Sequence, residues 1–256
     1  MNYNTYFYTM LHIFTLYSDS SKLQYLNQSN VKINYIHCTK SPFHFHDKIF
    51  EIKNIIKDIP DEDIICFIDA YDVLVISDEH EIIDKFLQYK CNLLIGAELN
   101  CYPERYKSSF PESKNSKYHY VNSGGYIGYK HAINKMFDWK NSDEIIEICK
   151  DGGDQAYVIE YYLNNIDFCK LDDKCLLFQN MCLVDLKEIY FQDHRVYNSI
   201  MDTYPSIIHF NGGTFLTNDG INIMPIFLDK LKNKNKSDLS EYKQRITSTC
   251  YPHPQK

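Results

Sequence analysis

Short apolar runs, each followed by polar or turn-forming residues, recur along the first hundred residues. Residues 11–17 (LHIFTLY) are rich in aromatic and β-branched side chains and precede the polar cluster 18–21. The same character recurs in residues 31–37 (VKINYIH), 63–68 (DIICFI) and 92–96 (NLLIG). Runs of this length bounded by turn residues are typical of strands buried inside a sheet. We therefore predict four buried strands in this part of the chain.

Helical signals lie between these strands. Apolar residues and lysines recur at helical spacing from about residue 45 to residue 58, and Ser77 with Asp78 precedes a second such stretch that runs to about residue 89. Ser and Asp are favourable N-cap residues. Strands that alternate with helices require crossover connections, and these favour a mainly parallel sheet. The pattern therefore predicts an α/β fold with a mainly parallel central sheet.

The second half of the chain is less regular. Residues 100–119 are polar and interrupted by proline, which predicts a long loop that acts as a lid. We predict a strand over residues 120–129 (YVNSGGYIGY), a helix over residues 153–163 (GDQAYVIEYYL) and a last strand over residues 205–210 (PSIIHF). The Lys- and Asn-rich segment after Lys230 predicts a mobile tail.

Length and composition agree with one sheet-centred domain. The chain has 256 residues, of which 44% are hydrophobic and 24% charged, and these values are within the range of ordinary globular proteins. Single α/β domains often reach about 250 residues. We therefore predict one domain over residues 1–230 and a C-terminal tail over residues 231–256.

Charge and hydrophobicity argue against several classes of protein. The net charge of −7 provides no positive field for phosphate backbones, so we expect no nucleic-acid partner. The sequence contains no run of about 18 apolar residues, and residues 1–10 lack the basic start of a signal peptide. We therefore expect a soluble, non-secreted protein without a membrane span. The nine cysteines are odd in number and form no C-x-x-C pair, so we expect mostly buried thiols.

Two carboxylates follow the predicted strand 63–68. Asp69 and Asp72 lie between apolar segments, and in open α/β sheets ligands bind beyond the carboxyl ends of the strands. An unpaired carboxylate in such surroundings is costly without a cation, and a divalent ion with oxygen ligands meets that need. The alternative is a structural role, because turns after strands favour Asp for backbone hydrogen bonding.

A histidine near the last predicted strand is a candidate third ligand. His209 is followed by Asn211 and Gly212, so an imidazole and backbone amides are expected at the same sheet edge as Asp72. Glycine lets a backbone approach a diphosphate closely. Two carboxylates with one imidazole suit Mn²⁺ better than an all-oxygen Mg²⁺ site. The alternative is a histidine with a purely structural role.

Two further polar segments interrupt regular elements. Asn122, Ser123 and Gly124 break what would otherwise be a continuous strand, and this pattern signals a bulge or a ligand against the backbone. A bend of the sheet is the alternative. Asp154 and Gln155 open a helix and offer a carboxylate and an amide suited to orienting sugar hydroxyls. The alternative is that Asp154 only caps the helix.

These segments, taken in order, resemble the glycosyltransferase domain of the procollagen lysyl hydroxylase (PLOD) family. The resemblance extends over roughly residues 10–217, and stand-alone giant-virus collagen glucosyltransferases are the most similar type that we can suggest. The matching motifs are FIDAYDVLV (67–75), AELNCYPE (97–104), NSGGYIG (122–128), GDQAY (153–157), LDDKCLLFQNM (171–181) and YPSIIHFNGGT (204–214).

The resemblance implies a GT-A (Rossmann-like) fold, Mn²⁺ as cofactor, and retaining transfer of glucose from UDP-glucose to galactosylhydroxylysine in collagen or a collagen-like chain. The family's metal-binding positions match Asp69, Asp72 and His209. The positions that match nucleotide-sugar-binding residues of the family are Thr15, Lys48, Asp69, Tyr71, Asn122, Ser123, Gly124, Asn211 and Gly212. Among these, Lys48 resembles the lysine that reaches the diphosphate.

The chain departs from the family pattern at two places. Tyr102 stands where the family commonly has Trp, which keeps an aromatic side chain in the lid, and a run of aspartates before Asp-Gln is reduced so that Asp154 is the match. We therefore expect Asp154 with Gln155 to be catalytic and to act at the acceptor end. Two alternatives stay open: galactose transfer to hydroxylysine itself, and a catalytically weak collagen- or sugar-binding module. If the protein is viral, we expect it in the cytoplasm (viral factory) or the virion, and an oligomer is possible.

Overall fold

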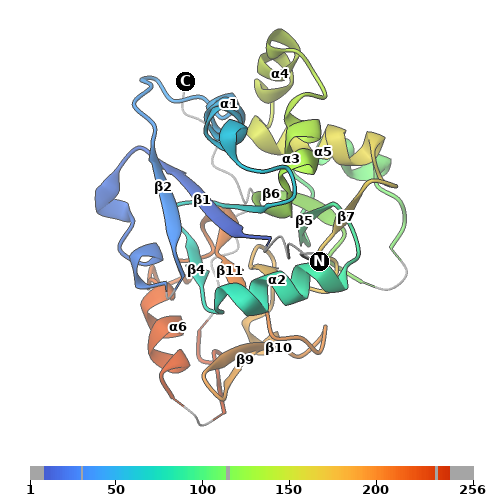
Figure 1. Cartoon of the computed structure of the whole chain (residues 1–256). Coiled ribbons are helices and arrows are strands. Elements are labelled where there is room, and N and C mark those ends of the chain that lie inside the picture. The colour runs from blue at the N-terminus through green and yellow to red at the C-terminus, as the bar shows by residue number, and fades with distance from the viewer. Residues whose placement is uncertain (1–8, 30, 114–115, 234–235, 243–256) are drawn as a thin grey trace, which may run out of the picture.

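A six-stranded sheet lies at the centre of the molecule (Figure 1), in the order β2-β1-β3-β6-β5-β7. The computed structural model describes residues 9–29, 31–113, 116–233 and 236–242. The strands of this sheet are β1 Leu11–Tyr17, β2 Ile33–His37, β3 Ile64–Ile68, β5 Leu93–Glu98, β6 Tyr120–Tyr129 and β7 Cys169–Leu171. β6 is antiparallel to β3 and β5, and the other neighbours pair in parallel. The predicted α/β fold class with a mainly parallel central sheet is confirmed.

Helices cover both faces of this sheet and complete two hydrophobic cores. The helices are α1 His46–Ile55, α2 Glu79–Gln88, α3 Lys130–Phe137, α4 Ser142–Cys149 and α5 Gly153–Asn164. α2 lies on one side of the sheet and the other four gather on the opposite side (Figure 1). In β3, Ile65 and Phe67 pack toward α1, α3 and α5, whereas Ile64, Cys66 and Ile68 pack toward α2. Because both faces of β3 are buried, its sequence is a continuous apolar run.

A second sheet adjoins the carboxyl end of β3. Its order is β4-β11-β8, with β4 Val73–Val75, β8 Phe178–Asn180 and β11 Ile207–His209. β11 pairs antiparallel with β4, so that His209 lies opposite Val73. The backbone N–H of Phe210 also donates to the carbonyl of Asp72, over 2.8 Å. This small sheet therefore brings a late segment of the chain beside the acidic turn that follows β3.

A third sheet contains residues from the predicted tail. Its order is β10-β9-β12, with β9 Ile189–Gln192, β10 Arg195–Asn198 and β12 Ser237–Asp238, and α6 spans Met224–Leu231. The side chain of Leu239 is fully buried in the larger core. The described residues beyond position 230 thus continue the packed structure and differ from the tail expected for 231–256, of which residues 243–256 lie outside the described part.

Most of the predicted long elements coincide with observed ones. The predicted strand 11–17 is β1, and the predicted helix 45–58 is α1 followed by a 3₁₀ turn over Ile56–Asp58. Asp78 caps α2 by accepting from the backbone N–H of Glu81, over 2.9 Å. Helices α3, α4 and α6 and the strands β4, β7, β8, β9, β10 and β12 were not predicted, and such short strands carry too little periodicity to be recognised. β11 lies within the predicted strand 205–210. The other 3₁₀ helices are Ser20–Lys22, Leu26–Gln28, Glu104–Ser109, Leu186–Glu188 and Asn211–Gly213.

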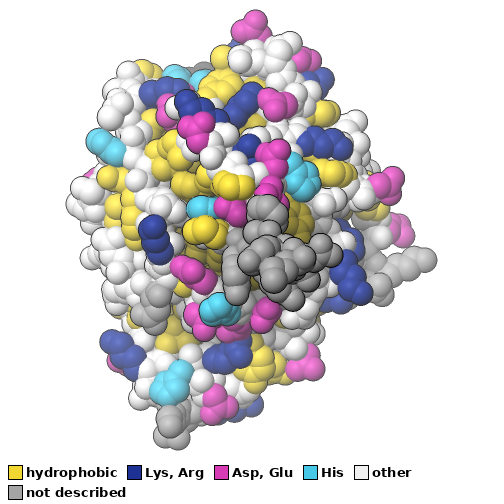
Figure 2. Space-filling model, viewed as in Figure 1, with side chains coloured by type: hydrophobic (Ala, Val, Ile, Leu, Met, Phe, Trp, Pro, Cys, Tyr) yellow, Lys and Arg dark blue, Asp and Glu magenta, His cyan; other side chains and the backbone are white. Residues whose placement is uncertain are grey.

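Charged side chains of both signs are mixed on the surface (Figure 2), and most cysteines are free thiols. Figure 2 shows Lys and Arg side chains dispersed among Asp and Glu on the face in view. Among the described residues, no helix has both the length and the apolar character that crossing a membrane requires. Cys91 and six buried cysteines are free thiols, as expected for most of them, whereas Cys182 is disulfide-bonded.

Candidate active site

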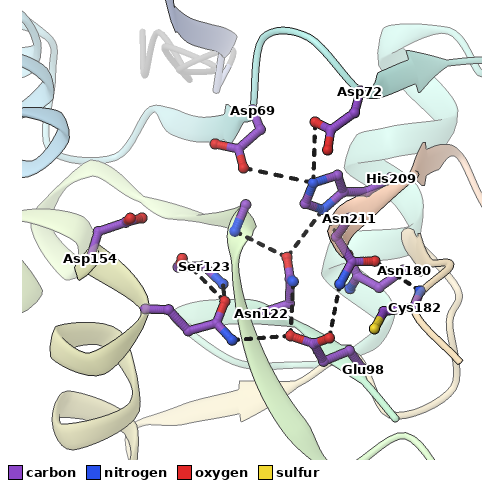
Figure 3. Close-up of polar contacts among 12 residues, drawn as sticks. Asp69, Asp72, Glu98, Asn122, Ser123, Asp154, Asn180, Cys182, His209 and Asn211 are labelled. Atoms are coloured by element: carbon purple, nitrogen blue, oxygen red, sulfur yellow. Dashed lines mark hydrogen bonds and ion pairs between the residues drawn. The ribbon is translucent and has the colours of Figure 1, made fainter. Parts of the chain in front are cut away.

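Asp69 and Asp72 lie on the turn that joins β3 to β4 (Figure 3). The backbone N–H of Asp69 donates to the carbonyl of Gly124, over 2.9 Å, and the carbonyl of Asp72 accepts from Phe210. β6 and the segment after β11 therefore hold the turn from two sides. The side chains of Asp69 and Asp72 are 27% and 24% exposed, so both carboxylates remain accessible to a ligand.

His209 reaches the same place from β11. Its Nε2 atom lies 3.7 Å from Oδ2 of Asp69 and 3.4 Å from Oδ1 of Asp72. Its Nδ1 atom lies 3.1 Å from Oδ1 of Asn122 and 2.9 Å from Oδ1 of Asn180. The amide nitrogens of these two residues donate elsewhere, to Glu98 and to a backbone carbonyl, so their oxygens face the ring. Nδ1 therefore carries a proton, so that in the neutral ring the Nε2 lone pair is directed at the two carboxylates and at any cation they hold.

The cluster fits a divalent cation. One ligand atom from each of Asp69, Asp72 and His209 lies within 4.8 Å of the other two. Metal-binding histidines generally donate their second ring N–H to an oxygen, as His209 does to Asn122 and Asn180. Two carboxylates and one imidazole are a donor set that Mn²⁺ accepts. The sequence expectation that these three residues converge is therefore correct, although Mn²⁺ itself is a proposal.

Lys48 and Asp154 extend the cluster along the sheet edge. The Nζ atom of Lys48, from α1, donates to Oδ1 of Asp69 over 2.7 Å and to Oδ2 of Asp154 over 3.4 Å. α5 has Gly152 at its N-cap position, without a side-chain cap, so Asp154 is not the cap of this helix. Lys48 therefore links the acidic turn to the residue expected at the acceptor end.

Burial and charge act in opposite directions on the pKa values of this cluster. Burial raises the pKa of Asp69, but Lys48 and His209 outweigh it and lower the pKa. Burial lowers the pKa of His209, but Asp72 and Asp69 outweigh it and raise the pKa. For Asp154 burial prevails over Lys48, and its pKa lies above the ordinary value. The cluster therefore combines carboxylates with unlike proton affinity, which is common where a site performs chemistry.

Two residues expected near the nucleotide have different surroundings. The Tyr71 hydroxyl oxygen accepts from the backbone N–H groups of Ser18, over 2.8 Å, and Asp19, over 2.9 Å, and so joins the end of β1 to the acidic turn. Thr15 is fully buried within β1, and its Oγ1 atom has no hydrogen-bond partner among the described residues. The structure therefore places Tyr71 at the sheet edge and Thr15 inside the sheet.

Gln155 is buried beneath the site and does not face the carboxylate cluster. Its Nε2 atom donates to the carbonyl of Tyr102 over 2.9 Å and to Oε1 of Glu98 over 3.1 Å. Its Oε1 atom accepts from the backbone N–H of Ser123 over 3.3 Å. Gln155 therefore fixes the start of α5 against the segment after β5 and against β6, and these contacts do not support the direct catalytic role expected for it.

Asn211 is buried, and its side chain forms hydrogen bonds inside the protein. Its Nδ2 atom donates to Oε2 of Glu98 over 2.8 Å, and its Oδ1 atom accepts from the backbone N–H of Cys182 over 3.0 Å. Gly212 follows in a left-handed conformation, with a φ angle of 69°. Sequence reasoning assigned no role to Glu98 or Asn180, although the position of Glu98 at the end of a wholly buried strand is a usable signal.

A family model and several curated proteins match the chain. The model of the family described as "PLOD GT domain" matches residues 46–236. Procollagen-lysine,2-oxoglutarate 5-dioxygenase 1 of Gallus gallus is 33% identical over 189 residues, which cover 69% of this chain and 25% of the relative. Multifunctional procollagen lysine hydroxylase and glycosyltransferase LH3 of Homo sapiens is 34% identical over 162 residues, which cover 60% of this chain and 21% of the relative.

A viral protein matches as well. Uncharacterized protein R699 of Acanthamoeba polyphaga mimivirus is 30% identical over 167 residues, which cover 64% of this chain and 35% of that protein. The chain spans about a quarter of the length of the procollagen-lysine relatives that it matches.

Proposed function

The chain belongs to the family described as the PLOD GT domain, and we propose that it transfers glucose from UDP-glucose to galactosylhydroxylysine in collagen or a collagen-like chain, with retention of configuration. The observation that carries this proposal is the convergence of Asp69, Asp72 and His209, with Lys48 and Asp154 adjacent. This arrangement offers a place for a nucleoside diphosphate at one end and for a sugar hydroxyl at the other.

The donor end uses the charged residues of the acidic turn. Asp69, Asp72 and His209 would hold Mn²⁺, which when bound neutralises charge on a diphosphate leaving group. Lys48 adds a second positive charge at the same place, since its Nζ atom lies 2.7 Å from Oδ1 of Asp69. Tyr71, on the turn between β3 and β4 with its hydroxyl against the backbone of Ser18, would contact the uridine. Fixed charges of this kind stabilise a leaving group without reorganisation during the reaction.

The acceptor end is assigned to Asp154. Its carboxylate lies at the start of α5 and is joined to the donor end through Lys48, over 3.4 Å. Asp154 would orient the attacking hydroxyl or stabilise positive charge on the sugar. Retention of configuration is compatible with a double displacement or with attack on the same face as the leaving group, and the proposal assigns no nucleophile.

A screen of donors and acceptors tests the proposal. Purified protein is incubated with UDP-glucose or UDP-galactose and with peptides carrying galactosylhydroxylysine or hydroxylysine, in Mn²⁺ or in chelator, and the products are identified by mass spectrometry. We expect a mass increase of one hexose only with UDP-glucose, galactosylhydroxylysine and Mn²⁺. Transfer of galactose to hydroxylysine would replace this proposal with the first alternative, and peptide binding without any transfer would replace it with the binding module.

The variant Asp72→Ala tests the donor end. We expect Mn²⁺-dependent transfer to be abolished while the far-UV circular dichroism spectrum is preserved, because Asp72 is partly exposed and contributes little to the core. The matched control is Asp84→Ala, which removes an exposed carboxylate of α2. Normal activity of Asp72→Ala at limiting Mn²⁺ would contradict the metal assignment.

The variant Asp154→Asn tests the acceptor end. Asn keeps the shape of the side chain but removes its charge, so we expect kcat to fall by about 10²–10³-fold, with UDP affinity changed much less. Isothermal titration with UDP and Mn²⁺ measures the second quantity. A variant with near-normal kcat would mean that Asp154 serves only to pair with Lys48, and the acceptor residue would have to be sought elsewhere in the site.

A further inference from the structure

Glu98 is a buried carboxylate on which three segments of the site converge (Figure 3). Its side chain is fully buried at the end of β5. It accepts hydrogen bonds from the side-chain amides of Asn122, over 3.0 Å, Gln155, over 3.1 Å, and Asn211, over 2.8 Å. These donors come from β6, from α5 and from the segment after β11. Burying a carboxylate costs free energy unless it is hydrogen-bonded, so losing any of these three hydrogen bonds would destabilise the folded protein.

The three amides share one orientation relative to Glu98. Each directs its NH₂ group at the carboxylate, so each presents its oxygen on the opposite side. The oxygen of Gln155 accepts from Ser123, and that of Asn211 accepts from Cys182. The oxygen of Asn122 lies 3.0 Å from the backbone nitrogen of Gly124 and 3.1 Å from Nδ1 of His209. An acceptor-only group at position 98, together with the backbone N–H groups of Ser123, Cys182 and Gly124 that donate to the amide oxygens, therefore favours one orientation of all three amides.

We propose that Glu98 is a positioning residue that, through Asn122, fixes the tautomer of His209 and so prepares Nε2 for a divalent cation. With the oxygens of Asn122 and Asn180 toward the ring, the neutral imidazole is protonated at Nδ1, and its Nε2 lone pair faces Asp69 and Asp72. If the Asn122 amide turned over, its NH₂ group would oppose the Nδ1 proton, and only the Asn180 oxygen, 2.9 Å from Nδ1, would still accept it. The population would then shift toward the tautomer protonated at Nε2, which cannot bind a metal through that atom. The inference rests on the metal site of the proposed function, but the tautomer is testable without metal.

The variant Glu98→Gln tests this inference. It keeps the size of the side chain but places an NH₂ group against the three amide donors, so at least one of them must turn or lose its bond. Substitution of residues that orient a metal ligand through hydrogen bonds typically lowers metal affinity by about 10–100-fold. We expect Glu98→Gln to weaken Mn²⁺ binding in that range, measured by isothermal titration without donor sugar. In the metal-free protein, ¹⁵N NMR of the imidazoles, recorded at a pH where the ring of His209 is neutral in both proteins, should show a larger fraction of the Nε2-protonated tautomer in Glu98→Gln.

The matched control is Asp172→Asn. Asp172 is another fully buried carboxylate, but it accepts from the backbone N–H groups of residues 176–178 and is not bonded to the ring of His209. We expect this variant to lose stability while its Mn²⁺ affinity and its His209 tautomer stay unchanged. The comparison separates loss of a buried charge in general from loss of the link to His209.

A double-mutant cycle with Asn122→Ala identifies the route of the effect. If Glu98 acts through Asn122, Glu98→Gln has little further effect on Mn²⁺ affinity or on the tautomer once Asn122 is removed. Additive effects would overturn the inference, as would a folded Glu98→Gln protein with wild-type Mn²⁺ affinity and tautomer. If Glu98→Gln does not fold, Asn122→Ala alone must weaken Mn²⁺ binding and shift the tautomer for the inference to stand. If wild-type protein binds no Mn²⁺, the proposed function fails, and the NMR measurement still decides the role of Glu98.

Discussion

His209 and Asp69 both pack against a residue that has no side chain. A Cβ atom at Gly124 would lie 2.2 Å from Cε1 of His209 and 2.7 Å from Oδ2 of Asp69. Both distances are well below van der Waals contact. Gly124, the first glycine of the segment NSGGYIG, thus allows the close approach of two candidate metal ligands to β6. Any side chain at position 124 would therefore collide with His209 and Asp69.

The variant Gly124→Ala should therefore damage the metal site more than the fold. We expect the added methyl group to displace the ring of His209 or the carboxylate of Asp69 and to weaken Mn²⁺ binding at least tenfold. Isothermal titration measures the affinity, and a thermal melt in chelator measures the fold. Gly213→Ala is the control, because a Cβ atom there meets nothing within 4 Å, although its φ of 76° adds some strain. Equal Mn²⁺ affinity in wild type and Gly124→Ala would show that the methyl group is accommodated elsewhere.

At the scale of elements, α1 determines where Lys48 lies. Its first turn contains Asp47, which accepts from Nζ of Lys40 over 2.7 Å and from the backbone N–H of His44 over 2.8 Å. Burial raises the pKa of Asp47, but these two hydrogen bonds outweigh it and hold the pKa below its ordinary value. An anion is also favourable at a helix N-terminus. The ionised form of Asp47 therefore anchors the helix that carries Lys48 to the site.

The variant Asp47→Asn should destabilise the protein in a pH-dependent way. Because the folded-state pKa is lowered, the contribution of the carboxylate is present above its unfolded pKa, about 3.9, and is lost as the pH falls through the folded value. We expect a loss of about 1–2 kcal/mol at pH 7 that shrinks at pH 3, measured by urea denaturation. The exposed Asp84→Asn is the control. A loss that is equal at both pH values would contradict the electrostatic explanation.

At the scale of the whole molecule, residues beyond position 230 belong to the packed structure. Ser237 and Asp238 pair with β9, and the side chain of Leu239 is fully buried. The same core includes Phe227 of α6 and Phe191 of β9. The folding unit therefore extends past the predicted boundary at least as far as Leu239.

The variant Leu239→Ala tests this boundary. Truncation of a buried leucine typically costs about 2–5 kcal/mol, and we expect a loss in that range in urea denaturation. Ile221→Ala is the control, because Ile221 is 44% exposed. A loss below about 0.5 kcal/mol, which is ordinary for a surface substitution, would mean that the segment contributes little to stability.

Binding of a cation should also be visible in the stability of the whole domain. A ligand at 100 times its Kd stabilises the folded state by about 2.7 kcal/mol. For a domain of this size that corresponds to a rise in Tm of roughly 5–10 °C. We expect this shift with Mn²⁺, its reversal by chelator, and its absence in Asp72→Ala. A wild-type Tm that is insensitive to Mn²⁺ would contradict the proposed site.

The sequence by itself determined the principal buried strands and the residue types at their ends. Continuous apolar runs identified β1 and β3, because strands buried on both faces need apolar side chains throughout. The same local reading placed Asp69 and Asp72 after β3, and His209 at the end of β11. Residue types within a few positions of one another carry this information, and it does not depend on how the elements pack.

Only the tertiary structure decided how the candidate site is supported. Glu98 and Asn211 are separated by 113 residues, and His209 and Asn180 by 29, so no local pattern relates them. Gln155, expected beside the sugar, is instead buried against Glu98 and Tyr102. The physical reason is that a buried polar group must find a partner, and the identity of that partner depends on which elements the sheet brings together.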